Sequence, residues 1–578
     1  MIAANIVVLK FGSSVLRSES DLPRVVHEIY RHWRGGSQVL VVVSAIGDTT
    51  DRLLRLAKAI CTEPEESALV KLLATGEATA SALLGIALHR AGIPAKVLDP
   101  AQAGLRTIGD ELDSEVVAVD VARLRAELEQ SVVVLPGFTG RNEEGDTTLL
   151  GRGGSDLSAV FVAHQLDARC ILLKDVDGLY TSDPTRMGAA VPLRFSHAKY
   201  ETALRVDGAI VQDKAVRFAA ECGLPFEITC IGASTGTQIG SDVDLVDGGE
   251  TAPNRLRVAL LGCGTVGGGV YERLTALPEL FEVIGVAVRD LSRARVPRVP
   301  ENLLTLDADE LIANPCDVVI ELIGGTERAS ALANSALQLS RHVVTANKAL
   351  IAAEGEQLQA VADANGVTLR ASAAVGGALP ALETIQGARA TGVISAFHGV
   401  LNGTTNFVLD QLARGEELQN AIGAAQQAGY TEADPTRDLD GTDAAQKLIL
   451  LARAAFGVSL PLAKISRRGI EHLSAEVLRE VRKRGCTIRL VAFCRSNGAG
   501  LEARVTPVEL PIDHPFARLK GAENGLIIET ENGARPIVRG TGAGRWPTTE
   551  AVIGDLLAIR CELSAAESIS EELEEVVA

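Results

Sequence analysis

Three observations predict an α/β protein with more than one domain. Along residues 1–240, short apolar runs alternate with amphipathic stretches, a pattern typical of a largely parallel sheet covered by helices. A polar segment that contains glycine and proline, residues 241–254, separates this half from the next. The second half opens with RVALLGCGTVGGG at residues 257–269, where an apolar run leads directly into a glycine-rich turn. That order is typical of the first strand, turn and helix of a Rossmann-type dinucleotide-binding domain.

The composition excludes several other classes of protein. The 578 residues, 47% of them hydrophobic, provide enough apolar side chains for several cores. No uncharged apolar run of about 18 residues is present and the N-terminus has no signal-peptide pattern, so we expect a cytoplasmic protein without a membrane partner. The nine cysteines form no CxxC pair, which predicts buried thiols in a reducing compartment. The net charge of −18 argues against binding to nucleic acid, and the acidic tail Glu567–Glu575 is interpreted as a solvated helix or a frayed end.

Glycine-bearing turns follow the expected strands of the first half. The clearest strands are Ile6–Lys10, Val39–Ser44, Val132–Gly137 and Ile171–Leu173, and the clearest helices are Asp21–Trp33, Glu66–Arg90 and Asp156–Leu166. The turn at residues 151–156 precedes a helix, so its backbone N–H groups and Arg152 are suited to hold an anion, while Asp156 is suited to orient a metal ion or a substrate amine. No GxxxxGK[ST] phosphate loop is present, and from spacing alone plain structural turns remain the simpler interpretation.

The glycines of the second-half turn each have a predicted task. Gly262 allows the sharp turn, Gly264 removes a side chain where backbone approaches a pyrophosphate, and Gly267 allows the following helix to pack closely on the strand. The N-terminus of that helix then offers N–H groups and a positive dipole end to phosphates.

The end of the next strand bears on the choice of cofactor. Phe281–Val288 runs into Arg289 and Asp290, about where this fold inspects the adenosine ribose. An acidic residue there favours NAD, whereas Arg289, followed by Arg293 and Arg295, favours NADP(H). A solvated loop is the competing interpretation of the arginines.

Charged residues gather further along the second half. Asp317–Gly325 is predicted to be a buried strand with a glycine turn, and His342–Leu350 a strand that runs out to Lys348. In residues 429–448, Asp443 and Lys447 are four positions apart on an expected helix and therefore share one face. This pair is either a stabilising surface ion pair or part of a carboxylate-lined pocket with a lysine proton donor.

Five motifs of the first half resemble aspartate kinases of the amino acid kinase family. They are KFGSSV at residues 10–15, VVVSAIGDTTDRL at 41–53, ATGE at 74–77, PGFTGRNEEGDTTLLGRGGSD at 136–156 and KDVDGLYTSDP at 174–184. The resemblance implies an α/β/α sandwich over residues 1–243 that transfers a phosphoryl group from ATP, with Mg²⁺, to the side-chain carboxylate of L-aspartate. Phosphoryl transfer depends mostly on positioning and on cationic stabilisation of phosphate oxygens, which lysine, arginine and glycine turns supply.

The resemblance also implies roles for particular residues. Lys10 would neutralise charge on the transferring phosphate. Aspartate would be held by residues that match the family's substrate positions, namely Ser44, Thr50, Glu77, Arg152, Ser155 and Asp156. The nucleotide would be held by Asp175, Tyr180 and Arg186.

The first half departs from this family at several positions. Ser13 stands where a second glycine is usual, Lys174 stands in place of a threonine, and the family's lysine after Gly208-Ala209 is missing. The family's paired regulatory domains also have no room, because a segment resembling the end of the kinase domain, residues 235–239, is followed by the dinucleotide-binding strand within about twenty residues. We therefore expect no feedback inhibition through such domains.

The second half resembles homoserine dehydrogenase. The motifs that carry this resemblance are NGTTN at residues 402–406, GYTEADP and DGTDAAQKL within 429–448, and RGTGAGRWPTTEAVIGDL at 539–556. The resemblance implies a linker at 244–254, a Rossmann-type domain at 255–375, a mixed α/β catalytic and dimerisation domain at 376–538, and a return to the nucleotide domain at 539–578. It also implies NAD(P)H-dependent reduction of L-aspartate 4-semialdehyde to L-homoserine by a homodimer or homotetramer.

This second resemblance assigns a site as well. Lys348 and Lys447 would meet the reacting carbonyl, with Lys447 as the proton donor and Asp443 ordering it, since a shielded lysine has a lowered pKa. Glu432 and Asp438 would bind the substrate ammonium. The cofactor would be held by Gly262, Gly264, Thr265, Val266, Gly267, Arg289, Gly324, Thr345 and Lys348. A sodium ion would be held by backbone carbonyls of Val375, Gly377 and Leu379, in a loop that departs from the family at Ser372 and Ala374.

Three hypotheses follow from the sequence. The first is a bifunctional enzyme with both activities. The second is an active dehydrogenase joined to a kinase-like domain that serves as a scaffold or binding module. The third is a nucleotide-binding sensor with neither activity, which the retained set of Lys348, Glu432, Asp443 and Lys447 argues against.

Overall fold

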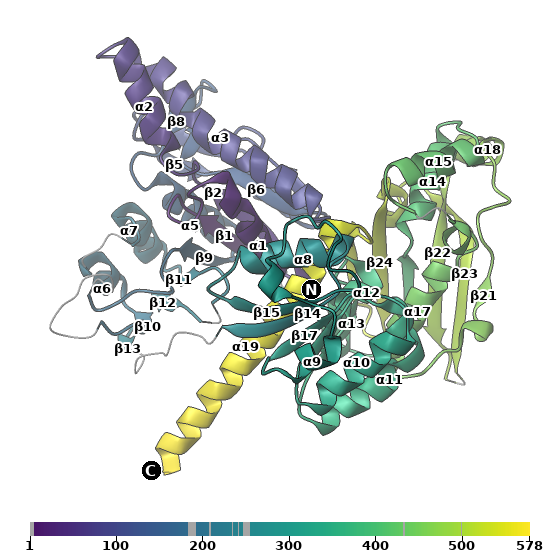
Figure 1. Cartoon of the computed structure of the whole chain (residues 1–578). Helices are drawn as coiled ribbons and strands as arrows, with labels where there is room; N and C mark the ends of the chain where they lie inside the picture. The colour runs from purple at the N-terminus through teal and green to yellow at the C-terminus, as the bar shows by residue number, and fades with distance from the viewer. Residues whose placement is uncertain are drawn as a thin grey trace. The chain divides into compact units, whose positions relative to one another are not determined.

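The computed structural model separates into two compact units, coloured along the chain in Figure 1. It describes residues 5–182, 192–206, 210–233, 235–240, 242–246, 255–431, 434–498 and 500–577, with side chains as far as residue 563. The first unit comprises Met1–His89, Pro94–Asn254 and Cys561–Ala578, and the second comprises Arg90–Ile93 and Arg255–Arg560. The predicted nucleotide residue Arg186 and the predicted substrate residue Glu432 lie outside the described residues.

The first unit is built on a nine-stranded sheet of order β13-β10-β12-β11-β9-β1-β2-β6-β3. Its centre is parallel and consists of β1 (Ile6–Phe11), β2 (Gln38–Val43), β6 (Val132–Pro136) and β9 (Arg169–Lys174). These strands are almost continuously apolar and buried, as expected when helices cover both faces of a parallel sheet. The four strands predicted here are therefore confirmed, with bounds that differ by a residue or two.

Helices and short strands complete the first unit. The helices are α1 (Leu22–Arg34), α2 (Thr49–Ile60), α3 (Glu66–Arg90), α4 (Val121–Leu128), α5 (Gly154–Leu166), α6 (Tyr200–Arg205) and α7 (Asp213–Cys222). The other strands of the main sheet are β3 (Ala95–Val97), β10 (Phe195–Ala198), β11 (Phe226–Cys230), β12 (Thr237–Ile239) and β13 (Leu245–Val246). A separate sheet contains β4 (Arg106–Ile108), β5 (Glu115–Ala118), β7 (Thr139–Arg141) and β8 (Thr147–Leu149).

Helix α3 has the length and composition of a membrane span, and no other helix in the described part of the chain does. Its buried residues recur with helical spacing, among them Leu73, Glu77, Leu84 and Leu88, which is typical of one face packed on a protein core. Glu77, a carboxylate within that face, lines the cavity described below.

The second unit begins with a six-stranded parallel sheet of order β16-β15-β14-β17-β18-β19. The strands are β14 (Leu256–Leu261), β15 (Phe281–Ala287), β16 (Leu304–Thr305), β17 (Val318–Glu321), β18 (His342–Thr345) and β19 (Leu369–Arg370). The helices between them are α8 (Thr265–Thr275), α9 (Ala308–Ala313), α10 (Glu327–Gln338) and α11 (Lys348–Ala364). This is the strand order 3-2-1-4-5-6 of the doubly wound dinucleotide-binding fold, so the predicted Rossmann-type domain is confirmed.

One predicted strand is too long. The strand that starts at His342 ends at Thr345, and Lys348 is the first residue of α11. The reason is a helix cap, because the side-chain oxygen of Asn347 accepts a hydrogen bond from the backbone N–H of Leu350 at 3.1 Å. Lys348 therefore stands at the start of a helix, just beyond the carboxyl end of a sheet strand.

A second sheet of order β21-β23-β22-β20-β24-β25 follows and is largely antiparallel. Its strands are β20 (Ile394–Val400), β21 (Ser466–Arg467), β22 (Cys486–Ser496), β23 (Leu501–Pro511), β24 (Glu523–Thr530) and β25 (Ile537–Thr541). Its helices are α12 (Ser372–Gly376), α13 (Ala381–Thr391), α14 (Gly403–Ala413), α15 (Leu418–Gln427), α16 (Thr436–Leu439), α17 (Thr442–Phe456) and α18 (Ala475–Lys483). On β22, alternate residues such as Leu490, Ala492 and Cys494 join Leu448 of α17 in one buried core.

The helix α19 (Arg545–Val577) begins in the second unit and contacts the dinucleotide-binding domain there. Buried Arg273 of α8 pairs with Glu550 of α19 at 3.4 Å, and the Arg545 guanidinium lies 3.1 Å from Glu272. The sequence that follows the antiparallel sheet thus packs against α8, the first helix of the nucleotide fold.

Candidate active sites

The glycine turn after β14 has the geometry that a dinucleotide requires. Gly262 has a φ of +97°, and a methyl group added to Gly267 would lie 2.1 Å from the carbonyl oxygen of Gly262. A methyl group added to Gly264 would meet no atom within 4 Å, so this glycine faces open space in front of α8. Thr265 and Val266 open α8 directly behind it. The turn thus leaves room for a phosphate at a helix N-terminus, and these residues fit a nicotinamide dinucleotide.

In the loop after β15, the acidic residue Asp290 is hydrogen-bonded within the loop itself. The Asp290 carboxylate accepts hydrogen bonds from the backbone N–H and the hydroxyl of Ser292, at 2.8 and 2.7 Å. Arg295 donates to carbonyls of its own loop, including that of Arg293 at 2.8 Å. Arg289 is exposed at the end of the strand. Asp290 and Arg295 are therefore engaged within their own loop, whereas Arg289 is exposed.

The next two strands end beside Lys348. Buried Thr345 donates its hydroxyl to the fully buried carboxylate of Glu321 at 2.6 Å and accepts the N–H of Asn347 at 3.0 Å. The Asn347 amide donates to the carbonyl of Gly325, next to Gly324, at 2.6 Å. These contacts fix the chain that leads into α11, where Lys348 is placed.

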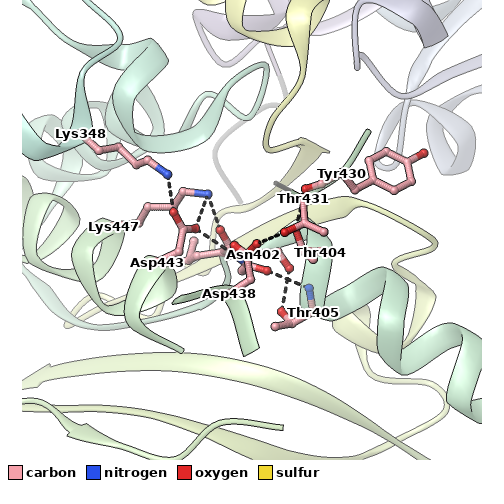
Figure 2. A network of polar contacts seen from close by, with 10 residues as sticks. Lys348, Asn402, Thr404, Thr405, Tyr430, Thr431, Asp438, Asp443 and Lys447 are labelled. Atoms are coloured by element: carbon pink, nitrogen blue, oxygen red, sulfur yellow. Dashed lines mark hydrogen bonds and ion pairs between the residues drawn. The ribbon is translucent and has the colours of Figure 1, made fainter. Parts of the chain in front are cut away.

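Lys348 and Lys447 meet on one carboxylate, that of Asp443 (Figure 2). Lys348 contacts Oδ1 of Asp443, although 95 residues separate them in sequence. Lys447, one helical turn beyond Asp443 on α17, lies 3.2 Å from Oδ2 and donates to the carbonyl of Leu401 at 2.7 Å. The exposed fraction is 5% for the Lys447 side chain, 13% for Asp443 and 37% for Lys348, so the cluster runs from the interior towards solvent.

Asn402 connects this cluster to a second carboxylate. Its amide nitrogen donates to Oδ2 of Asp443 at 3.0 Å and to Oδ1 of Asp438 at 2.7 Å (Figure 2). The Thr431 hydroxyl donates to the other oxygen of Asp438 at 2.7 Å. Asn402 is itself held as the N-cap of α14, because its side-chain oxygen accepts the N–H of Thr405 at 2.8 Å.

The electrostatics of the cluster favour a reactive lysine. Burial lowers the pKa of Lys447, and the positive charge of Lys348 lowers it further, against the opposing effect of Asp443. Burial alone would raise the pKa of Asp443, but the charges of Lys447 and Lys348 outweigh it and hold that pKa well below its usual range. Asp443 is therefore a constant anion, and Lys447 is an ammonium group that gives up its proton more readily than a solvated lysine.

The loop predicted to bind sodium lies beside the end of β25. Val375 belongs to α12, and Gly377 has a φ of +54° and packs against the backbone of Gly542. The carbonyl of Leu379 accepts the N–H of Ala381 at 2.8 Å. At the departure Ser372, the hydroxyl donates to Glu383 and Asp555, at 2.6 and 2.9 Å. No cluster of metal-binding side chains occurs among the described residues, so a cation site here would rest on carbonyls and stays a prediction.

The first unit contains a cavity of about 740 Å³ at the carboxyl ends of β1, β2 and β9. Every predicted kinase residue within the described part of the chain lines it, namely Lys10, Ser44, Thr50, Glu77, Arg152, Ser155, Asp156, Asp175 and Tyr180. These residues come from segments up to 170 positions apart in sequence, and a parallel sheet brings the ends of such segments to one edge.

A buried ion cluster stands at the base of this cavity. Asp156, in the first turn of α5, lies 2.6 Å from the ammonium of Lys10 and 3.0 Å from that of Lys174. Burial would raise the pKa of Asp156, yet the charges of Lys10 and Lys174 reverse this and keep it ionised. Burial lowers the pKa of Lys10, with Asp156 opposing it. Lys174, which departs from the kinase family's threonine, is thus part of the cluster.

Glu77 lies in the same cavity and predicts a measurable pH dependence. Burial, opposed by a 3.3 Å hydrogen bond from the N–H of Ala45, raises the pKa of Glu77 to about 7. The native state then keeps this proton while the unfolded state loses it near pH 4.5, so Glu77 makes the free energy of unfolding fall as pH rises from about 4.5 to about 7. Glu77→Gln should stabilise the first unit by about 3 kcal/mol at pH 8 and hardly at all at pH 4.

Hydrogen exchange of peptides from β1 and α5 at the two pH values measures this difference. Glu66→Gln, an exposed carboxylate on the same helix, is the matched control and should show no pH-dependent change. Equal protection of Glu77→Gln and the unaltered protein at pH 8 would mean that Glu77 is ionised at little cost in the folded chain.

Two residues of these sites have no role predicted from the sequence. Asn402 bridges two carboxylates, and Lys174 pairs with Asp156. A signal for Asn402 was present, because Asn followed by Gly-Thr-Thr at the end of an apolar strand is typical of a helix cap. For Lys174 the only signal was its position at the end of a strand neighbouring that of Lys10.

A Rossmann-type domain joined to a polar site with two lysines defines the second half as a nicotinamide-dependent oxidoreductase. The chain matches the NAD-binding domain of homoserine dehydrogenase over residues 262–372 and homoserine dehydrogenase over 380–557. It is 35% identical over 316 residues to a homoserine dehydrogenase of Synechocystis sp., covering 53% of this chain and 73% of that protein. The chain therefore belongs to the homoserine dehydrogenase family, and it has homoserine dehydrogenase activity with NAD(P).

Two further comparisons agree. A homoserine dehydrogenase of Corynebacterium glutamicum is 37% identical over 324 residues, covering 54% of this chain and 73% of that protein. A crystal structure of a homoserine dehydrogenase from Thiobacillus denitrificans has a TM-score of 0.51 at 34% identity, covering 54% of this chain and 74% of the other. Residues 5–230 match the amino acid kinase family, so the chain joins a domain of that family to the dehydrogenase.

Proposed function

We propose that the chain catalyses two reactions, the reduction of L-aspartate 4-semialdehyde to L-homoserine with NADPH and the phosphorylation of L-aspartate by ATP. The observation that carries the first is the meeting of Lys348 and Lys447 on Asp443. The observation that carries the second is the cavity lined by the residues expected to bind aspartate and nucleotide.

In the dehydrogenase, the chain's contribution is to hold the aldehyde and to move a proton. NADPH, when bound by the glycine cradle, supplies the hydride. The Lys447 ammonium donates a proton to the carbonyl oxygen as the C=O π bond breaks, which leaves a hydroxyl group on the product and a neutral amine on Lys447. Asp443 remains ionised and holds both lysines against their mutual repulsion.

Orientation of the substrate is assigned to the carboxylates beside this pair. Asp438 is connected to Asp443 through Asn402, whose amide group donates a hydrogen bond to each carboxylate. Among the described residues, the Asp438 carboxylate accepts hydrogen bonds from the neutral groups of Asn402 and Thr431, so its negative charge suits the substrate ammonium. Glu432 is proposed for the same role on the strength of the family resemblance alone.

The preference for NADPH is supported by the loop after β15. Asp290, which would favour the ribose hydroxyls of NAD, is turned onto Ser292, whereas Arg289 is exposed and suits a 2′-phosphate. Steady-state kinetics of homoserine oxidation with each oxidised cofactor test this assignment. The specificity constant should be higher with NADP⁺, and a higher value with NAD⁺ would contradict the role given to Arg289.

In the kinase, an oxygen of the aspartate side chain attacks the γ-phosphorus of ATP. A bond forms between that oxygen and phosphorus, the bond from phosphorus to the β–γ bridging oxygen breaks, and ADP leaves with the electron pair. Lys10 would neutralise the phosphoryl oxygens, and Arg152, Ser44 and Ser155 would hold the amino acid, which is supported by their position on the cavity wall. Mg²⁺, carried by the nucleotide, would neutralise further charge.

The test is ATP-dependent formation of aspartyl phosphate, trapped as the hydroxamate with hydroxylamine. We expect hydroxamate formation that requires both ATP and L-aspartate and disappears in Lys10→Met. A purified chain that oxidises homoserine but forms no hydroxamate above background would favour the second candidate, in which the kinase-type domain is a binding module. The observation that keeps this candidate open is Ser13, a side chain on the cavity wall in a turn where phosphate would approach.

A further inference from the structure

The ion cluster formed by Lys10, Asp156 and Lys174 holds two ammonium groups and one carboxylate. We propose that Lys174 binds phosphate oxygens of the nucleotide, as a second cationic arm beside Lys10. This inference rests on the proposed kinase function for the identity of the anion, and it assigns a residue that the kinase resemblance does not.

Sheet register brings the two lysines together. β1 and β9 are neighbouring parallel strands in which Lys10 is paired with Leu172, so Lys174 lies two residues further along β9. Side chains two residues apart on a strand point to the same face, and Leu172 packs in the core beneath α5. Lys10 and Lys174 therefore both face α5, whose first turn carries Asp156.

The three charged groups are almost completely removed from solvent. The exposed fractions are 5% for Lys10, 3% for Asp156 and 9% for Lys174. Lys10 makes a single close contact of 2.6 Å with Oδ1, while Lys174 lies 3.3 and 3.0 Å from Oδ1 and Oδ2. One carboxylate neutralises one ammonium group, so a positive charge is left over at a site where water cannot screen it well.

The neighbouring acid does not cancel this surplus below neutral pH. Glu77 is a further carboxyl group that interacts with Lys10, and burial raises its pKa to about 7. Asp175 also lines the cavity, on the chain directly after Lys174. A bound anion completes the charge balance of Lys10, Asp156 and Lys174, and a buried surplus charge is a strong reason for an anion to bind.

The walls of the cavity provide further groups that suit a phosphate. Gly12 lies beside the Lys10 ammonium, and a methyl group added there would come within 2.7 Å of it, so the glycine keeps that ammonium accessible. Gly154 and Ser155 line the cavity and open the 13-residue helix α5, whose N-terminal N–H groups are further donors. Lysine acts on phosphate as a point charge, which suits a group whose three oxygens change orientation during transfer.

In the transfer step, the ammonium groups of Lys10 and Lys174 would contact the phosphate groups of ATP. As the bond from the γ-phosphorus to the bridging oxygen breaks, negative charge moves onto the β-phosphate of the departing ADP. An ammonium at position 174 in contact with those oxygens stabilises that charge, while Lys10 stabilises the transferring phosphoryl group. Asp156 holds both ammonium groups in place throughout.

The experiment is calorimetric titration of the full chain with MgATP in the absence of aspartate. Lys174→Met should weaken MgATP binding by about tenfold or more, the effect expected on losing a charge-assisted hydrogen bond, whereas Lys174→Arg should stay within about threefold of the unaltered chain. Lys71→Met, an exposed lysine of the same unit, is the matched control and should bind as the unaltered chain does. Homoserine oxidation by the same preparations should be equal, because the second unit is unchanged.

Each outcome decides the assignment. Unchanged MgATP affinity in Lys174→Met would overturn it, even where hydroxamate formation shows that the kinase is active. MgATP binding that depends on Lys174, without any hydroxamate formation, would support the role of Lys174 and contradict the proposed transfer to aspartate. A chain that binds neither MgATP nor inorganic tripolyphosphate would overturn it as well, and weakened binding of L-aspartate alone in Lys174→Met would move the residue to the amino-acid site.

Discussion

Replacing Lys447 with methionine is expected to lower kcat for homoserine oxidation about 10³-fold, within the range ordinarily lost with a general acid or base. The reason is that Lys447 is buried, lies beside the constant anion Asp443, and has a lowered pKa. Methionine has similar length and no charge, so packing around α17 is kept. Cofactor affinity should stay within about twofold, because the glycine cradle lies in the other domain of the second unit.

Two companion variants sharpen this prediction. Lys447→Arg keeps a positive charge but cannot release a proton near neutral pH, so it should be nearly as slow as Lys447→Met. Lys464→Met removes an exposed lysine of the same domain and should leave kcat unchanged. Turnover by Lys447→Arg close to that of the unaltered chain would show that charge alone is needed at this position, and the proton-transfer role would be wrong.

The pH dependence of homoserine oxidation is a second test of Lys447→Met. In the oxidation direction Lys447 must be neutral to accept the hydroxyl proton, so the rate should rise with pH and level off below the ordinary lysine pKa. Lys447→Met should lose that rising limb along with the rate.

The second large effect concerns stability. Asp156→Ala leaves the ammonium groups of Lys10 and Lys174 buried without their shared carboxylate, and breaking a buried ion pair in this way costs about 3–5 kcal/mol. The free energy of unfolding of the first unit should fall by that amount, measured by hydrogen exchange of peptides from β1, β9 and α5.

A double variant tests the cause of that loss. Adding Lys174→Met to Asp156→Ala removes one of the two unpaired charges and should recover part of the stability. Asp213→Ala breaks an exposed ion pair with Arg217 in the same unit and should cost less than about 1 kcal/mol. A cost for Asp156→Ala as small as that of Asp213→Ala would contradict the view that the cluster is dehydrated and charged.

Local features of both halves could be predicted from the sequence because they depend on neighbouring residues. The tasks of Gly262 and Gly267 follow from backbone geometry within six positions, and the structure has a positive φ at the first and a close carbonyl at the second. The pairing of Asp443 with Lys447 follows from helical spacing and is confirmed at 3.2 Å.

Contacts across the fold could not be predicted in the same way. The contact between Lys348 and Asp443 spans 95 residues and joins the first turns of two different helices, α11 and α17. The pattern of apolar residues also predicted a strand that is too long before Lys348. A four-residue strand followed by a helix cap has too few apolar positions to mark where the strand ends. Asn347, the capping residue, was the better signal there.

The proposed reduction of the aldehyde depends most on two ammonium groups that meet the reacting oxygen. A crystal structure of the chain with oxidised cofactor and homoserine tests this directly. We expect the homoserine hydroxyl within hydrogen-bonding distance of Nζ of Lys447, with Lys348 beside it and the homoserine ammonium in contact with Asp438. A hydroxyl bound elsewhere, with Lys447 still closed onto Asp443 and the carbonyl of Leu401, would contradict it.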